Sequence, residues 1–261
     1  MNRIVLVIMS AVLLFSGCAT TDPLDDPHAT VEQMYTQAKQ ELTDGRYERA
    51  IKGYEALQAR YPYGHYAQQA ALEAAYAYYK NEEKEQALAA LDRFIKQYPT
   101  HPNIDYAYYL IGIINFIEDK SLFKDIAQQD IAERDPQAAK ASFEAFQTLL
   151  KRFPKSRYAK DARERMLFLT AALAEHELHI ARYYYQRGAY LAAANRAKTV
   201  LEYYANTSRV KSALAMLILS YDKIGESKLR DDAKRVFERN YPGVDPLQAA
   251  NFNAKAWWHL W

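Results

Sequence analysis

One short motif, a basic or polar residue followed by an aromatic residue and proline, recurs along the chain and constrains its fold more than any other feature. It ends four helix-sized segments, at Arg60-Tyr61-Pro62, Gln97-Tyr98-Pro99, Arg152-Phe153-Pro154 and Asn240-Tyr241-Pro242, and a degenerate copy stands at Tyr203-Tyr204-Ala205. The first two prolines are 37 residues apart (99 minus 62), which is typical of arrays of short helical repeats. Because proline cannot continue a helix, each copy closes one unit.

Each predicted unit carries the other marks of a helical hairpin. A break separates two helices at Asp44-Gly45-Arg46, Asn81-Glu82-Glu83, Arg187-Gly188-Ala189 and Ile224-Gly225-Glu226, and glycine there can take the left-handed conformation that ends a helix. Small residues stand where antiparallel helices would cross closely, at Ala38, Ala75, Gly112 and Ala181 in the first helices and at Ala50, Ala87, Ser142 and Ala193 in the second. These marks predict an all-α tetratricopeptide-repeat solenoid of about five helical hairpins with a C-terminal capping helix.

The composition agrees with a helical repeat protein and argues against other classes. Of the 261 residues, 50% are apolar and 13% are aromatic, so a continuous core is easily built. Only 8 glycines and 9 prolines are present, which leaves little room for a loop-rich catalytic domain. The formal net charge of +2 is too close to neutral for a nucleic-acid-binding surface, so no nucleic-acid partner is expected.

The first 18 residues resemble the signal sequence and lipidation box of bacterial lipoproteins. The apolar stretch from Ile4 to Phe15 is too short to span a bilayer, and Cys18, the single cysteine of the chain, follows small residues. We expect residues 1–17 to be a signal peptide and Cys18 to carry an N-acyl diacylglycerol, with residues 18–30 as a polar tether. In the lipoprotein sorting code that this region resembles, Asp after the cysteine retains a protein in the inner membrane. Ala19 stands there instead, so the resemblance implies the periplasmic face of the outer membrane. The alternative is an ordinary secretory signal with an incidental cysteine.

The rest of the chain divides into two groups of repeats and a tail. Repeats 1–3 are expected at 31–156, with an insertion at 119–135 between helices from about Ile104 to Glu118 and from about Pro136 to Arg152. The insertion is either a solvated loop or a partner contact. Repeats 4 and 5 are expected at 157–242, and the first helix of repeat 4 is long, from about Tyr158 to Arg187.

The tail, residues 243–261, is predicted to form one amphipathic helix from about Pro246 to Trp261. Its apolar residues fall on one helix face, at Leu247, Ala250, Ala254, Trp257, Trp258 and Trp261. So much apolar surface must be covered. We expect the helix to cap the end of the fifth repeat, with a partner or the membrane surface as the alternative.

No pattern in the sequence indicates catalysis or metal binding. The run His176-Glu177-Leu178-His179 is similar to a zinc-protease helix, but its histidines are three residues apart where that motif needs four. A phosphate-binding glycine loop and a serine nucleophile elbow are also lacking in the sequence. The protein is therefore predicted not to be an enzyme and to bind no metal and no cofactor besides the lipid.

Four stretches together resemble the BamD family, also called ComL or YfiO, of the β-barrel assembly machine. They are Arg60 to Tyr66, Ala77 to Asn81, Ile95 to Tyr106 and Arg134 to Ala138, and the resemblance covers about residues 30–242 and the lipidation box. It implies a lipid-anchored periplasmic scaffold at the outer membrane, with other Bam lipoproteins among its partners. It also implies that the C-terminal repeats dock the periplasmic domain of BamA, and that the N-terminal repeats receive the aromatic-ended C-terminal signals of unfolded outer-membrane proteins.

The first helices of repeats 1–3 supply a candidate groove for such a peptide. One face of each first helix lines the concave side of this architecture, and it would carry Tyr35, Lys39, Leu72, Tyr76, Tyr79, Lys80, Tyr106 and Tyr109. Aromatic rings with nearby cations suit a peptide that ends in phenylalanine and a carboxylate. Alternatively, several of these tyrosines are core residues between repeats.

Arg196, on the second helix of repeat 4, is the candidate docking residue. The resemblance implies an arginine at this position that pairs with an acidic residue of BamA, and a planar guanidinium suits such a bidentate contact. The alternative is a simply solvated arginine. A second function class also stays open, a lipid-anchored tetratricopeptide adaptor of another cell-envelope complex.

Overall fold

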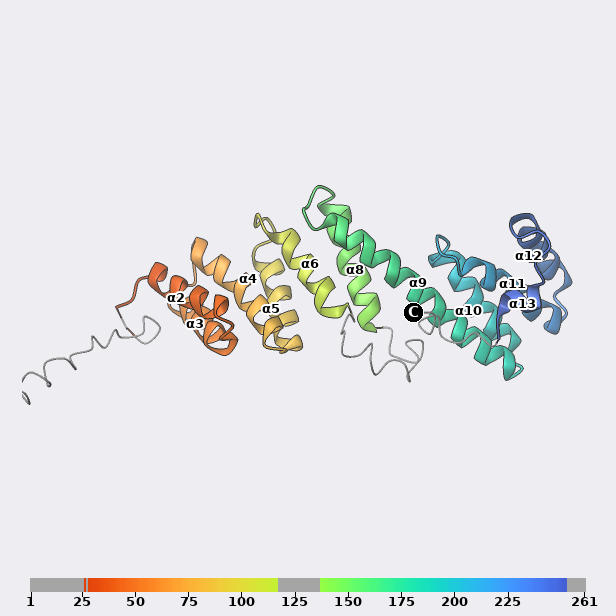
Figure 1. Cartoon of the computed structure of the whole chain (residues 1–261), viewed down its shortest axis with the longest axis horizontal. Coiled ribbons are helices and arrows are strands. Elements are labelled where there is room, and N and C mark those ends of the chain that lie inside the picture. The colour runs from red at the N-terminus through yellow and green to blue at the C-terminus, as the bar shows by residue number, and fades with distance from the viewer. Residues whose placement is uncertain (1–25, 27, 117–136, 253–261) are drawn as a thin grey trace, which may run out of the picture. The chain divides into compact units, whose positions relative to one another are not determined.

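The computed structural model describes residue 26 and residues 28–116 and 137–252, and every regular element within those ranges is a helix (Figure 1). The chain divides into two compact units, Met1–Pro99 and Thr100–Trp261, which are described separately. The predicted signal peptide, Cys18 and the insertion at 119–135 lie outside the described residues.

The first unit contains two helical hairpins. Their helices are α2 (Val31–Thr43), α3 (Tyr47–Arg60), α4 (His65–Lys80) and α5 (Lys84–Gln97). Helix α2 begins at a capping box, in which the Thr30 side chain accepts from the Gln33 amide and the Gln33 side chain accepts from the Thr30 amide. Helices α3 and α4 also pack together, so the second hairpin covers the apolar face of the first.

The second unit continues the same pattern with one longer helix. It contains α6 (Ile104–Asn115), α8 (Gln137–Arg152), α9 (Ala159–Gln186), α10 (Tyr190–Tyr203), α11 (Val210–Ile224), α12 (Ser227–Asn240) and α13 (Pro246–Ala250). Helix α9 has 28 residues, which confirms the expected long first helix of repeat 4. Consecutive helices pack in pairs, α6 with α8, α9 with α10 and α11 with α12.

The turns inside the hairpins lie where the sequence predicts them. Gly45, Gly188 and Gly225 have φ angles of 76°, 78° and 79°, in the left-handed region that glycine enters without a steric penalty. In the corresponding turn of the second hairpin a non-glycine residue, Glu82, takes the same conformation with φ of 65°. All four breaks therefore use the same left-handed backbone conformation, although one of them lacks glycine.

The small residues predicted at helix crossings are buried. Seven of them have no exposed surface, namely Ala38, Ala50, Ala75, Ala87, Ser142, Ala181 and Ala193. At the eighth, Gly112, an added Cβ would lie 2.3 Å from Cε1 of Phe146, so α6 and α8 approach closely only because this residue has no side chain. The Ser142 hydroxyl donates to the Gly112 carbonyl across the same crossing, at 2.8 Å.

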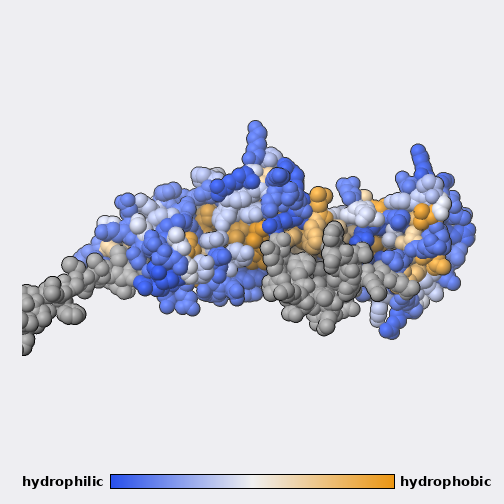
Figure 2. Space-filling view, in the orientation of Figure 1, coloured by the Kyte–Doolittle hydropathy of each residue, from blue (hydrophilic) through white to orange (hydrophobic). Residues whose placement is uncertain are grey.

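The surface of the described part is mainly polar, as Figure 2 shows for one face. Large apolar side chains such as Met34, Tyr54 and Leu57 in the first unit, and Phe146 and Met216 in the second, are fully buried between helices. No helix within the described ranges combines the length and apolar character needed to cross a bilayer.

The C-terminal tail differs from its prediction. Helix α13 has five residues: Asp245 caps it by accepting from the Leu247 amide at 3.0 Å, and Asn251 ends it in the left-handed conformation with φ of 50°. A single helix from Pro246 to Trp261 is therefore wrong, because the backbone leaves the helical region at Asn251. Residues 253–261, including the three tryptophans, lie outside the described residues.

Candidate peptide groove and docking surface

The candidate groove of the first unit centres on Glu73 of α4, a residue that the sequence analysis missed. Its carboxylate accepts from the Tyr35 hydroxyl at 3.0 Å, from the Lys39 ammonium at 2.7 Å and from the Gln69 amide at 3.0 Å. The hydroxyl of Tyr54 donates to the other carboxylate oxygen. The structure thus brings the predicted residues Tyr35 and Lys39 together, but around an internal carboxylate.

The surroundings of Glu73 keep it ionised. Burial alone would raise the pKa of Glu73, but hydrogen bonds from Lys39, Tyr54 and Gln69 hold that pKa below its usual value. Burial, together with this carboxylate, raises the pKa of Tyr35 and of Tyr54, so both phenols stay protonated and donate. The charge of Lys39 is therefore balanced inside the protein, and an incoming peptide carboxylate would compete with Glu73 for it.

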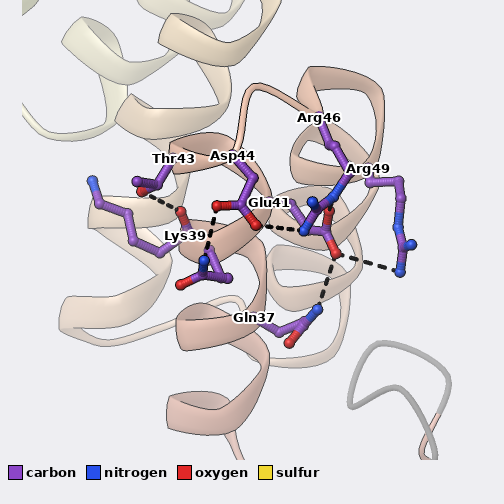
Figure 3. A network of polar contacts seen from close by, with 8 residues as sticks. Gln37, Lys39, Glu41, Thr43, Asp44, Arg46 and Arg49 are labelled. Carbon is purple, nitrogen blue, oxygen red and sulfur yellow. Dashed lines mark hydrogen bonds and ion pairs between the residues drawn. The ribbon is translucent and has the colours of Figure 1, made fainter.

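A second carboxylate, Glu41, holds the end of α2 (Figure 3). Glu41 is 1% exposed and is bound by the Arg46 guanidinium, by Arg49 Nη2 at 3.4 Å and by Gln37 Nε2 at 3.0 Å. Figure 3 shows the ammonium of Lys39 pointing away from this network. Because Glu41 and Glu73 bind different cations, the turn after α2 and the face that carries Lys39 are held independently.

The predicted aromatic pair on α4 is present. Tyr76 and Tyr79 are partly buried, with ring centroids 6.3 Å apart at an interplanar angle of 51°. The neighbouring Lys80 is exposed, and its Nζ lies 5.8 Å from the centroid of the Tyr47 ring. This contact resembles a cation–π interaction, which leaves the ammonium open to an anion.

Leu72 does not line a surface. It is 2% exposed, and on a helix it shares the face of Ala75, three residues later, which is fully buried. Its predicted place in the groove is therefore wrong, because α4 turns this side chain into the protein interior.

Tyr106 and Tyr109 belong to the second unit, whereas the other six predicted groove residues belong to the first. The Tyr109 ring stacks on Tyr158 at 4.5 Å and 18°, and Tyr106 lies 5.4 Å from the same ring. The Tyr109 hydroxyl donates to Asp161 at 2.9 Å, and burial followed by this carboxylate raises the pKa of Tyr109 to about 12. Both tyrosines therefore contribute to packing between α6 and the start of α9.

Arg196 lies on α10 at the edge of an open cleft of about 310 Å³. Tyr184, Asn195 and Thr199 contribute to the same cleft. The Nη1 atom of Arg196 lies 3.2 Å from Oε2 of Glu177, and the two side chains are 43% and 8% exposed. One side of the guanidinium is thus oriented by a buried carboxylate, while the rest of the side chain is open to a second acidic group.

The sequence did not indicate a role for Glu177 at the docking surface; it drew notice only as part of the run His176 to His179, which is similar to a zinc-protease helix. In the structure Glu177 binds and orients Arg196. Within the ranges 28–116 and 137–252, no three His, Cys, Asp or Glu residues converge in a way that could hold a metal ion.

Paired helices that leave charged and aromatic side chains on their surfaces define a helical-repeat protein. A family model described as YfiO, outer membrane lipoprotein, matches residues 27–236. The chain belongs to this family.

Individual relatives agree with this assignment. The chain is 45% identical over 263 residues to the outer membrane protein assembly factor BamD of Neisseria meningitidis serogroup B, with 98% of each chain covered. It is 37% identical over 237 residues to the protein of the same name from Xylella fastidiosa, which covers 90% of this chain and 81% of that one. A crystal structure of MamA is 17% identical, with a TM-score of 0.32, and the match covers 86% of this chain and 97% of that one.

Proposed function

We propose that the protein is a lipid-anchored periplasmic scaffold of the β-barrel assembly machine at the outer membrane. In this role the C-terminal repeats (157–242) dock the periplasmic domain of BamA. The N-terminal repeats (31–156) receive the C-terminal signals of unfolded outer-membrane proteins, and other Bam lipoproteins bind the same scaffold. The observation that carries the proposal is the match along 98% of the chain to a protein named as an outer membrane protein assembly factor.

The docking part of the proposal rests on the surroundings of Arg196. Because Glu177 binds one guanidinium nitrogen, the planar group is oriented before a partner arrives, and less side-chain entropy is lost on binding. The open cleft beside it gives a partner carboxylate room to approach. Arg196 therefore suits an interfacial contact with an acidic residue of BamA.

The docking experiment is capture of BamA from detergent-solubilised envelopes by the tagged protein. Arg196→Glu should reduce capture at least tenfold, because it places like charges at the interface and beside Glu177. Lys198→Glu is the matched control, since Lys198 lies on the same helix with a side chain that is 60% exposed. A charge reversal on the partner should restore capture by Arg196→Glu, and equal capture by the two variants would contradict the docking role.

For the peptide signal, the surroundings of the two lysines favour Lys80 over Lys39 as the cation for the carboxylate. Lys39 is 2.7 Å from Glu73, whereas Lys80 is exposed above an aromatic ring. The rings of Tyr76 and Tyr79, on the same helix, then offer an apolar surface for a terminal phenylalanine. This arrangement supports reception of an aromatic-ended peptide in the N-terminal repeats.

The anchor is proposed at Cys18. Two or three acyl chains on this residue would hold the protein at the membrane stably, since each buried methylene contributes about 0.8 kcal/mol. Cys18→Ser should therefore leave the protein soluble or unprocessed in cell fractionation. A mature Cys18→Ser protein still firmly in the outer membrane would contradict the anchor.

A further inference from the structure

The segment Pro246–Phe252 lies on the first helices of repeats 4 and 5. Helix α13 packs beside α11, as Figure 1 shows at the C-terminal end of the described chain. Ala249 and Ala250 are only 6% and 1% exposed, whereas Leu247, in the first turn of the same helix, is 57% exposed. The segment therefore buries two small side chains at its C-terminal end.

Arg182 of α9 holds the end of this segment. Its Nε donates to the backbone carbonyl of Ala250 at 3.1 Å, and Arg182 itself is only 9% exposed. Three residues further along α9, on the same helix face, the Tyr185 ring lies 5.0 Å from the ring of Phe252. A backbone carbonyl and an aromatic ring two residues later are thus recognised by one face of α9.

Within the described part of the chain, the ion pairs under the segment join two arginines to one carboxylate. Glu175 Oε1 lies 2.8 Å from Arg182 Nη1, and its Oε2 lies 2.8 Å from Arg209 Nε. The two arginine side chains are 10% and 29% exposed and that of Glu175 is 13% exposed, so two positive charges face one negative charge in a partly buried site. The tail segment offers these arginines only the neutral backbone carbonyl of Ala250.

These contacts are of a kind that another polypeptide can reproduce. They use a backbone carbonyl, two side chains no larger than methyl and one ring, and none depends on a residue unique to the tail. A partner with an acidic residue close to these groups would also meet the surplus positive charge, and hydrogen bonds to a charged acceptor are stronger than those to a carbonyl.

We infer that the face of α9 and α11 is a second peptide-docking site, occupied by the chain's own residues 246–252 until a partner displaces them. The partner is a peptide segment with two small residues, an aromatic ring two positions later and an acidic neighbour. The segment and the site belong to one chain, so the internal segment competes at a high effective concentration. The site is thereby kept closed to weak ligands.

The test uses a fluorescent synthetic peptide with the sequence of residues 244–252 and the purified full chain. In the release variant Ala249→Arg/Ala250→Arg, side-chain bulk and like charge should expel the internal segment. Anisotropy should then show peptide binding at least tenfold tighter than to the unchanged protein, since only the freed fraction of sites can bind. A folded release variant, checked by circular dichroism, that binds no tighter than the unchanged protein would overturn the inference.

Two further variants keep the test decisive. Phe252→Ala removes one ring at the end of the segment and should give a smaller gain in peptide binding, so the site can be tested even if the double variant unfolds. Adding Arg182→Gln to either variant should abolish the gain, and peptide binding that survives this change lies elsewhere and overturns the inference. Capture of BamA through Arg196 is measured separately, so failure of one proposal leaves the other standing.

Discussion

The two units each contain a nearly buried carboxylate on the first helix of a repeat, and the groups around the two carboxylates differ. The side chains of Glu73 and Glu175 are 12% and 13% exposed. Glu73 is bound by one cation, two phenols and an amide, so its charges cancel. Glu175 is bound by two arginines, so the ion pairs among the described residues leave one positive charge in excess.

The difference separates a structural network from a binding site. Around Glu73 the donors come from residues of the first unit alone, and the network ties α2, α3 and α4 together. Around Glu175 the network is completed by a carbonyl of the tail segment. A carboxylate with matched donors stabilises the fold, whereas one with surplus cations leaves a charge that a ligand can use.

The largest expected effect is on the first network. Glu73→Ala should lower the free energy of unfolding by about 3 kcal/mol, because it leaves partly buried hydroxyl and ammonium groups without their acceptor. Urea denaturation followed by circular dichroism measures the loss. Glu32→Ala, which removes an exposed carboxylate from the first turn of α2, should cost no more than about 1 kcal/mol. Equal losses would show that the Glu73 network is not structural.

The second network should respond less to the loss of one member. Arg182→Met should lower the free energy of unfolding by about 2 kcal/mol, because Glu175 keeps Arg209 while the Ala250 carbonyl loses its donor. It should also raise the rate of proteolytic cleavage near Asn251. Arg182→Lys keeps the charge but loses the planar guanidinium, so its free energy of unfolding should lie between those of the unchanged protein and Arg182→Met. If Arg182→Lys equals the unchanged protein in both measurements, charge alone holds the tail.

Lysine substitutions sharpen the comparison within the first unit. Lys80→Gln should weaken binding of a peptide ending in phenylalanine about fivefold, close to 1 kcal/mol, without changing stability, because Lys80 is exposed. Lys39→Gln should lower the free energy of unfolding, because it removes a donor from Glu73. Fluorescence anisotropy and urea denaturation measure the two effects. Unchanged peptide binding by Lys80→Gln would contradict its assignment as the cation for the carboxylate.

The smallest expected effect concerns Tyr109. Its pKa is raised to about 12 from 10.0, so the neutral phenol stabilises the fold fully below pH 10 and this contribution is lost as the pH rises through 12. In a titration followed by ultraviolet absorbance, Tyr109→Phe should remove the signal of one phenol that ionises near pH 12. Asp161→Asn should lower the pKa of Tyr109 toward 10, because it removes the carboxylate that, after burial, raises this pKa. If Tyr109→Phe instead removes the signal of a phenol that ionises near pH 10, the prediction is contradicted.

Much of the fold could be predicted because hairpin geometry imposes local requirements on single residues. The crossing at Gly112 tolerates no Cβ, and the turns at Gly45 and Gly225 need a positive φ. The Glu73 network was missed, although a signal was present. Lys39 and Tyr35 precede Glu73 by 34 and 38 residues, close to the repeat interval of 37, so residues one repeat apart lie side by side on successive first helices.

The tail could not be predicted in the same way. Its apolar residues recur at helical intervals through Trp261, and periodicity alone does not show that Asn251 leaves the helical conformation. The capture of the Ala250 carbonyl depends on Arg182, 68 residues earlier, and such a contact to a backbone atom leaves no pattern in the sequence. Glu177 was likewise hidden, because its partner Arg196 lies across a hairpin.

The length of α9 has a consequence for how this family can change over time. Asp161 and Arg182 lie 21 residues apart on this one helix, which places the contact with Tyr109 and the tail site about 32 Å apart along its axis. One inserted residue between them would rotate one site against the other by about 100°. Insertions or deletions within α9 should therefore be rare or come in steps of about seven or eleven residues, which nearly restore the phase.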